Sequence, residues 1–241
     1  MPLDVLTFAQ SVEHMIVLAR GSYPAFVVTA NVDHLVRFAR DPSVRDLYTD
    51  ADLVVADGMP VIWASRFLGK RLPERVAGSD LFPTLSARAA DEGLSIYLLG
   101  GAPGTADRAA DILRQRHPSL RIAGTYCPDF GFEKDADECR RIADRIRDAR
   151  TDILFVGLGS PKQEHWIAKH RMHAGAKLSI GVGISFSFLC GDVVRAPRWM
   201  QRFGLEWLHR LVQEPARLWK RYLIEDMAFF RLVLRERFRR V

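Results

Sequence analysis

Asp57 is the residue whose type and position most clearly suggest chemistry. It follows the β-branched apolar run 53–56 and precedes Gly58, a pattern typical of a buried strand that ends in a turn. Ligands bind at the carboxyl ends of the strands in open α/β sheets, so this carboxylate is expected at the mouth of a crevice. It could act there as a general base, or it could cap the helix expected at 60–67.

Small polar residues follow the preceding apolar run, and an arginine lies in a loop after the Asp57 region. Thr29 and Asn31 could hydrogen-bond a sugar or a phosphate, and they could equally cap the next helix. Arg75 stands in the polar loop 71–80, where its guanidinium could bind phosphate or simply remain solvated. All three are candidates for substrate binding, each with an ordinary structural alternative.

Glycines mark two other turns between an apolar run and a helix. Gly100 and Gly101 could expose backbone N–H groups to a phosphate at a helix N-terminus. Gly159 lies in a second such turn, and Gln163 and Glu164 follow it in the first turn of the next helix. These five residues are also candidates for substrate binding. The dinucleotide pattern G-x-G-x-x-G is absent, which disfavours an oxidoreductase of the Rossmann type.

The sequence offers no strong metal site and no covalent nucleophile. The patterns His-Glu-x-x-His and G-x-S-x-G are both absent. Two Asp-x-Asp strings, at 50–52 and 135–137, lie before a strand and at a helix start, where acidic residues are ordinarily structural. We therefore expect neither a metal ion nor another cofactor, which leaves Asp57 as the best-placed general base.

The elements that must position these residues alternate along the chain. Strands and helices following one another predict an α/β fold with a Rossmann-like, mostly parallel sheet and helices on both faces. The composition changes at about Arg195, and the remaining residues are expected to form two or three helices. We therefore expect an α/β core at 1–194 and a helical, basic appendage at 195–241.

Positive charge is concentrated in the appendage. It contains 12 Lys and Arg residues against 5 acidic residues, or +7, so with a whole-chain charge of +6 the first 194 residues amount to −1. Three of the five tryptophans also lie there. A basic, aromatic helical segment indicates an anionic partner such as acidic lipid, lipid phosphate or nucleic acid.

The rest of the composition points to a cytoplasmic protein. The three cysteines show no C-x-x-C spacing, the N-terminus lacks a signal-peptide pattern, and no apolar run reaches about 18 residues. We therefore expect no membrane span. The apolar stripes of the appendage could pack on the core or face lipid, and their exposure would allow weak self-association.

Taken in order, the motifs closely resemble the WecG/TagA/CpsF family, glycosyltransferase family 26, over essentially the whole chain. Each motif alone is modest, whereas several in the same order are specific. They are Thr-Ala-Asn at 29–31, Ala-Asp-Gly-Met-Pro at 56–60, Glu-Arg-Val-Ala-Gly-Ser-Asp at 74–80, Gly-Leu-Gly-Ser-Pro-Lys-Gln-Glu at 157–164, Gly-Leu-Glu-Trp-Leu-His-Arg-Leu at 204–211 and Glu-Pro-Ala-Arg at 214–217.

The resemblance implies an inverting, metal-independent transfer of a sugar from a UDP-sugar to a saccharide on polyprenyl diphosphate, at the inner face of the bacterial cytoplasmic membrane. By position, Asp57 matches the family's proposed catalytic base. Thr29 and Asn31 match the polar pair at its pocket, Arg75 the arginine near the donor phosphates, and Gln163 a donor-contacting glutamine. The core would then hold the UDP-sugar.

The resemblance also assigns a role to the appendage, which in the family closes over the active site. Arg210, Arg217 and Arg221 match basic residues that contact the acceptor's diphosphate, and Lys220 could replace Arg221 in that role. The implied products are cell-surface or exopolysaccharide chains. N-acetylmannosamine, its uronic acid and glucose all remain open as the transferred sugar.

A non-enzymatic protein that binds anionic lipid or nucleic acid through the appendage is the alternative. Such a binding function would not explain the polar residues Thr29, Asp57 and Gln163 at predicted strand ends. We therefore favour the enzyme, with an anionic membrane surface and no nucleic acid among its partners.

Overall fold

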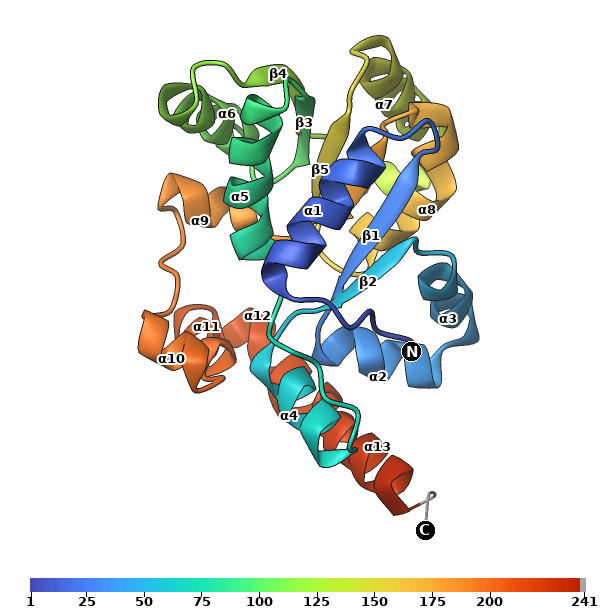
Figure 1. The fold of residues 1–241 in the computed structure, drawn as a ribbon, viewed down its shortest axis with the longest axis vertical. Helices are drawn as coiled ribbons and strands as arrows, with labels where there is room; N and C mark the ends of the chain where they lie inside the picture. The colour runs from blue at the N-terminus through green and yellow to red at the C-terminus, as the bar shows by residue number, and fades with distance from the viewer. Residues whose placement is uncertain (239–241) are drawn as a thin grey trace.

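The computed structural model describes residues 1–238, apart from the side chains of Arg217 and Arg221. Its centre is a six-stranded sheet in the order β2-β1-β6-β5-β3-β4, and every recorded strand pair is parallel, which confirms the predicted α/β class (Figure 1). The strands are β1 Ala25–Ala30, β2 Leu53–Ala56, β3 Ser95–Gly100, β4 Arg121–Tyr126, β5 Ile153–Gly157 and β6 Leu178–Gly181.

Helices cover both faces of the sheet because alternate strand residues point to opposite sides. On β1, Val27 packs into one buried core, whereas Phe26 and Val28 pack into another. The first core is closed by α1 Phe8–Ala19, α5 Gly78–Asp91, α6 Thr105–Arg116 and α9 Ser185–Cys190. The second is closed by α3 Pro42–Thr49, α7 Ala136–Asp148 and α8 Lys162–Ala174.

Two helices continue directly from the strand ends that carry candidate residues. Helix α2, Val32–Arg40, starts right after β1, and α4, Met59–Phe67, starts just after β2. A short 3-10 turn, Phe132–Lys134, precedes α7. Because parallel strands all end at the same edge of the sheet, the side chains at these turns gather there.

The segment after residue 194 is helical through its described part. It consists of α10 Arg198–Arg202, α11 Glu206–Gln213, α12 Pro215–Lys220, a π-helical turn Arg221–Glu225 and α13 Met227–Phe238. Helix α13 is anchored to the core, since Ala228 and Phe229 pack on Val36 of α2. All six strands lie before residue 182. The division into two domains at 194/195 stays a prediction.

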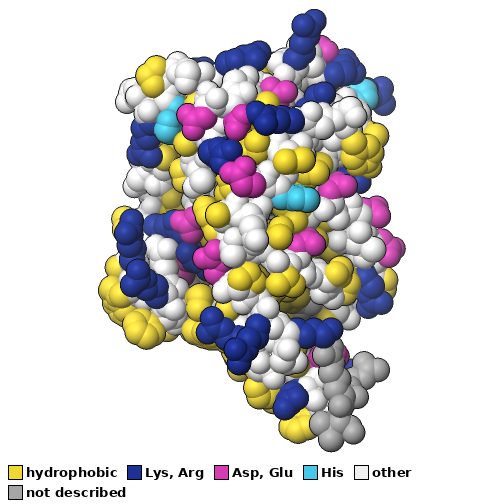
Figure 2. Space-filling view, in the orientation of Figure 1, with side chains coloured by type: hydrophobic (Ala, Val, Ile, Leu, Met, Phe, Trp, Pro, Cys, Tyr) yellow, Lys and Arg dark blue, Asp and Glu magenta, His cyan; other side chains and the backbone are white. Residues whose placement is uncertain are grey.

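The surface of this region carries both basic and apolar side chains, as its composition leads us to expect. Figure 2 shows basic and hydrophobic side chains together on the protruding part of the molecule, which Figure 1 assigns to α4 and the appendage. Within residues 1–238, no helix has the length and apolar character needed to cross a bilayer.

Candidate active site

A cleft of about 980 Å³ opens at the carboxyl ends of β2, β1, β6 and β5, between the sheet and the appendage. The sequence-predicted residues that line it are Thr29, Asn31, Asp57, Arg75, Gly159, Gln163 and Arg210. The strand ends thus bring together residues that lie up to 181 positions apart in the chain. A cavity of this volume is large enough for a nucleotide sugar or a ligand of similar size.

Asp57 is held at the end of β2 with its carboxylate toward the cleft. Its backbone N–H donates to the Ala30 carbonyl at 2.8 Å, and its Oδ2 accepts from the Gly78 N–H at 3.3 Å. It does not cap α4, because Gly58 occupies the N-cap position and no side chain caps that helix. The capping alternative is therefore wrong for this residue.

The environment of Asp57 suits a general base. Burial raises its pKa to about 6; the positive charge of Arg75 opposes this rise, and the negative charge of Glu206 adds to it. A carboxyl with this pKa is mostly ionised at neutral pH, yet it is a stronger base than an ordinary aspartate. It can therefore accept a proton from a hydroxyl group in the cleft.

Thr29 and Asn31 form one wall of the cleft from the end of β1. The Thr29 hydroxyl donates to the Gly181 carbonyl at 3.4 Å. Asn31 Oδ1 accepts from the His34 N–H at 3.3 Å and caps α2. Asn31 thus caps the next helix and also lines the cleft, so the capping role does not prevent it from facing a ligand.

A buried hydrogen-bonded chain lies behind this wall. His34 Nδ1 is 2.8 Å from Asn31 Oδ1, and His34 Nε2 is 3.2 Å from Glu164 Oε1. Gln163 Nε2 donates to the same Glu164 oxygen at 2.7 Å, and Gln163 Oε1 accepts from the Gly183 N–H at 3.1 Å. Burial would raise the pKa of Glu164, but the hydrogen bonds from His34 and Gln163 outweigh it and the pKa is lowered.

The chain fixes the side-chain orientation of Gln163 against the cleft floor. Glu164 is 2% exposed and does not line the cleft, so it positions other residues and is placed away from any ligand there. Gly181 makes room for Gln163, because a Cβ at that position would lie 2.8 Å from Gln163 Cδ. His34 is a member of this network that the sequence analysis missed.

Gly100 and Gly101 do not line the cleft. A Cβ at Gly100 would lie 2.9 Å from the carbonyl of Gly157, and one at Gly101 would lie 3.2 Å from the Phe186 ring. Both glycines therefore allow β3, β5 and α9 to approach closely. The geometry gives them a packing role and lends no support to the expected phosphate-binding role.

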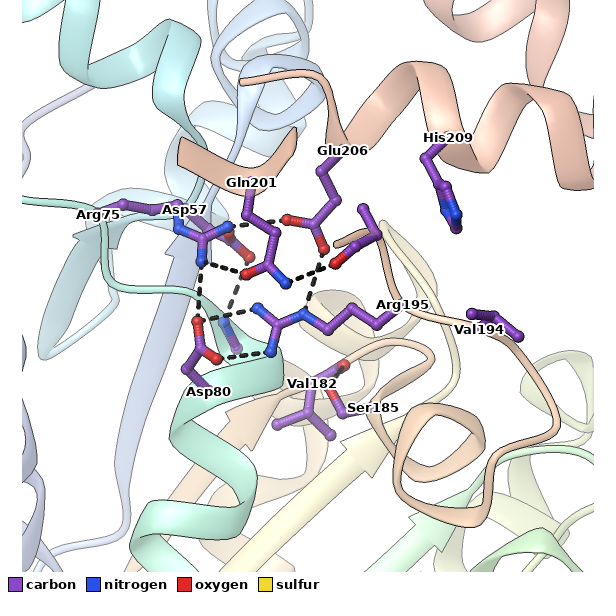
Figure 3. Close-up of polar contacts among 12 residues, drawn as sticks. Asp57, Arg75, Asp80, Val182, Ser185, Val194, Arg195, Gln201, Glu206 and His209 are labelled. Carbon is purple, nitrogen blue, oxygen red and sulfur yellow. Dashed lines mark hydrogen bonds and ion pairs between the residues drawn. The ribbon is translucent and has the colours of Figure 1, made fainter. Parts of the chain in front are cut away.

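Arg75 belongs to an ion-pair cluster that joins the core to the appendage (Figure 3). Its guanidinium contacts Glu206 Oε2 at 2.8 Å, Asp80 Oδ2 at 3.0 Å and Gln201 Oε1 at 3.2 Å. Arg195 donates to both Asp80 oxygens, at 2.6 and 2.9 Å, and lies 3.4 Å from Glu206 Oε1. We call these five residues the clamp.

The clamp shapes the charge around the proposed base. Burial would raise the pKa of Asp80, but its hydrogen bonds and ion pairs with Arg195 and Arg75 outweigh this, so the pKa is lowered. Asp80 and Glu206 lie inside two of the sequence motifs, which was the available signal for them. Gln201 and Arg195 were marked by no motif.

Arg210 brings a second guanidinium to the cleft from α11. Its Nε atom is buried and has no hydrogen-bond partner within the described residues. A buried donor without a partner is costly, so this atom is suited to a ligand oxygen. The side chains of Arg217 and Arg221 lie outside the described residues. Lys220 is exposed and does not line the cleft.

The described residues contain no group of three or more His, Cys, Asp or Glu side chains arranged to hold a metal ion. The charged side chains that line the cleft are the carboxylates Asp33, Asp57, Glu206 and Asp226 and the guanidinium groups of Arg75 and Arg210. The arrangement can deprotonate a hydroxyl and bind an anionic group beside it.

Comparison with known proteins identifies the class of enzyme. A model of the glycosyl transferase WecG/TagA/CpsF family matches residues 1–241. A relative from Bacillus spizizenii (strain ATCC 23059 / NRRL B-14472 / W23) is 35% identical over 199 residues, which cover 83% of this chain and 75% of the relative. A relative from Bacillus subtilis (strain 168) is 33% identical over 199 residues, with the same coverage. Both are named N-acetylglucosaminyldiphosphoundecaprenol N-acetyl-beta-D-mannosaminyltransferase. The chain is therefore a glycosyltransferase and belongs to the WecG/TagA/CpsF family.

Proposed function

We propose that this enzyme transfers N-acetylmannosamine from UDP to N-acetylglucosamine on polyprenyl diphosphate, with inversion at the anomeric carbon and without a metal ion. The choice of sugar and acceptor is supported by the names of the two relatives. The observation that carries the mechanism is the placement of Asp57, with its pKa raised to about 6, in one cleft with Arg75 and Arg210.

In the proposed step, an acceptor hydroxyl attacks the anomeric carbon on the face opposite UDP. The new carbon–oxygen bond forms as the bond to the UDP oxygen breaks, and the leaving UDP keeps that electron pair. Asp57 takes the proton of the hydroxyl. The guanidinium group of Arg75 offsets the negative charge that develops on UDP, the task that a cation performs in other transferases, and Arg210 binds the diphosphate of the acceptor.

Thr29, Asn31 and Gln163 are proposed to contact the donor. Each carries hydrogen-bonding groups on a rigid strand end or helix start, which favours recognition of a hydroxyl- and amide-rich sugar. The His34–Glu164 pair behind them holds Asn31 and Gln163 in place. Gly159 lines the same cleft from the end of β5.

The enzyme is further proposed to work as a peripheral protein on the inner face of the cytoplasmic membrane. Trp219 of α12 and Val212 of α11 are 49% and 75% exposed beside the basic residues of the appendage. Apolar exposure next to positive charge favours an anionic bilayer surface. The same exposure supports weak self-association, which sedimentation in the absence of lipid would detect.

The test is UDP release by the purified protein in the presence of EDTA. UDP-N-acetylmannosamine, its uronic acid, UDP-glucose and UDP-N-acetylglucosamine are offered with a short-chain prenyl-diphosphate N-acetylglucosamine acceptor. We expect release with the first donor only, dependent on the acceptor and unaffected by EDTA. Release with another donor would correct the identity of the sugar, and loss of activity in EDTA would refute the metal-free mechanism. Failure of the protein to bind UDP would refute the proposed site.

A further inference from the structure

The cleft extends beyond Asp57 into an apolar groove between two helices. Residues spaced by three or four positions share one face of a helix, and each helix contributes such a stripe to the cleft lining. The two stripes, together called the α4–α13 groove, are Met59, Trp63 and Phe67 of α4 and Met227, Phe230 and Leu234 of α13.

The groove is open and its walls are fixed. Trp63, Phe67, Phe230 and Leu234 are 44%, 51%, 55% and 49% exposed, so these large apolar side chains are not buried by the described part of the chain. Figure 1 draws α4 over α13, and the Arg237 guanidinium of α13 lies 5.9 Å from the centre of the Phe67 ring of α4. The opposite face of α13 packs on α2, which keeps this wall in place.

The inner end of the groove meets the proposed catalytic centre. Met59 is two residues from Asp57, and the α4 stripe then runs outward for roughly 12 Å, at about 1.5 Å per residue. Trp63 packs against the turn between α10 and α11, because a Cβ at Gly204 would lie 3.1 Å from Trp63 Cζ2. Arg210 lines the same cleft, so the groove leads from the part of the cleft that holds this guanidinium to the surface.

The outer end of the groove is basic. Exposed cationic side chains lie in or just after the last turns of both helices: Arg66, Lys70 and Arg71 on the α4 side and Arg235 and Arg237 on the α13 side. The ligand that suits such a groove has an anionic head at the inner end and a long apolar tail, and it leaves the protein next to an anionic surface. A peptide fits less well, since apolar walls would leave its backbone N–H and C=O groups without partners.

We propose that the α4–α13 groove holds the first isoprene units of the acceptor's polyprenyl chain and guides the rest into the bilayer. This inference rests on the proposed function, which supplies an acceptor with a diphosphate head and a prenyl tail. A chain already dissolved in a membrane gains little apolar burial on entering the groove. The groove therefore serves mainly to place the diphosphate at Arg210 while the distal chain stays in lipid.

The test uses acceptors in water without lipid, whose prenyl tails increase from a methyl cap to several isoprene units. Burial of one methylene group favours binding about fourfold, so KM of the wild-type protein should fall at least about tenfold as the tail fills the groove, and then level off. In the double variant Phe67→Ser with Phe230→Ser, this dependence should vanish, while turnover of the methyl-capped acceptor is unchanged. Trp219→Ser is the matched control, because this residue is 49% exposed and lies outside the cleft lining, and it should keep the dependence.

Photocrosslinking of the wild-type protein provides a readout that does not depend on folding of the variant. A prenyl diphosphate carrying a benzophenone in its second isoprene unit should label peptides of α4 and α13. A dependence of KM on tail length that survives in the double variant, or labelling confined to other elements, would refute the proposal that the groove holds the prenyl tail. If a second copy of the chain occupied the groove instead, the wild-type protein would form dimers and the double variant would not, while the dependence of KM on tail length would stay intact. That result would also refute the proposal. Failure of the wild-type protein to use any acceptor would instead refute the proposed function.

Discussion

Replacing Asp57 with asparagine should stabilise the protein at neutral pH, because the native fold disfavours the charge on this carboxyl. Burial raises the pKa from the ordinary value of 3.8 to about 6, with Arg75 opposing and Glu206 adding to the effect. At about 1.4 kcal/mol per pH unit, this difference corresponds to about 3 kcal/mol of unfolding free energy that the ionised carboxylate removes.

The sign of the effect depends on pH. Between pH 3.8 and about 6 the native protein binds more protons than the unfolded chain, so its stability falls as the pH rises through this window. Asparagine has nearly the shape of a protonated carboxyl and carries no charge. The stability gained by Asp57→Asn should therefore be nearly absent near pH 4 and complete above about pH 7.

Urea unfolding of both proteins at several pH values measures this difference. At about pH 7.5 the variant should exceed the wild-type protein by about 3 kcal/mol, or by roughly 6 to 12 °C in Tm. Asp46→Asn removes the same charge from the exposed surface of α3 and should give no comparable rise. Equal stabilities at every pH, or a larger gain at acidic pH, would refute the reasoning.

Three further variants test the surroundings of the base. Glu206→Gln should shift the acidic limb of kcat/KM down by about one pH unit, because it removes a carboxylate that raises the pKa of the base; an unmoved limb, or the same shift in the distant surface variant Glu92→Gln, would contradict this. Gly181→Ala should weaken UDP binding about tenfold in calorimetry, since its Cβ would collide with the Gln163 side chain; undiminished affinity would show that this glutamine does not contact the donor. Asp80→Asn should speed proteolysis between the core and the appendage about fivefold, because it weakens two hydrogen bonds that hold the appendage. An unchanged cleavage rate would mean that the clamp does not hold the appendage in place.

The sequence predicted the sheet well because its strands are short apolar runs that end in glycine or polar residues. Parallel strands deliver such ends to one edge, so the sequence alone places Thr29, Asp57 and Gln163 together, and all three line the cleft. Gly100 and Gly101 show the limit of that argument. These two glycines also follow a strand, but they allow close packing against β5 and α9 and do not line the cleft.

The clamp and the buried network could not be predicted in this way. Arg195 reaches Asp80 across 115 residues, and His34 reaches Glu164 across 130, so no local pattern marks either pair. The first pair depends on how the appendage packs on the core, and the second on how α8 packs within the core. The structure also decides between the two roles of Asp57, because Gly58 occupies the N-cap of α4 and the Asp57 carboxylate accepts a hydrogen bond from the Gly78 N–H instead.

The most direct test of the central claim is UDP release by the wild-type protein, Asp57→Asn and Asp57→Glu, with UDP-N-acetylmannosamine, the lipid-linked acceptor and EDTA present. UDP binding is measured in parallel by calorimetry. We predict that the asparagine variant loses about a thousandfold or more in kcat, that the glutamate variant retains part of the activity, and that both bind UDP as the wild-type protein does. An asparagine variant that turns over at the wild-type rate would contradict the assignment of Asp57 as the base.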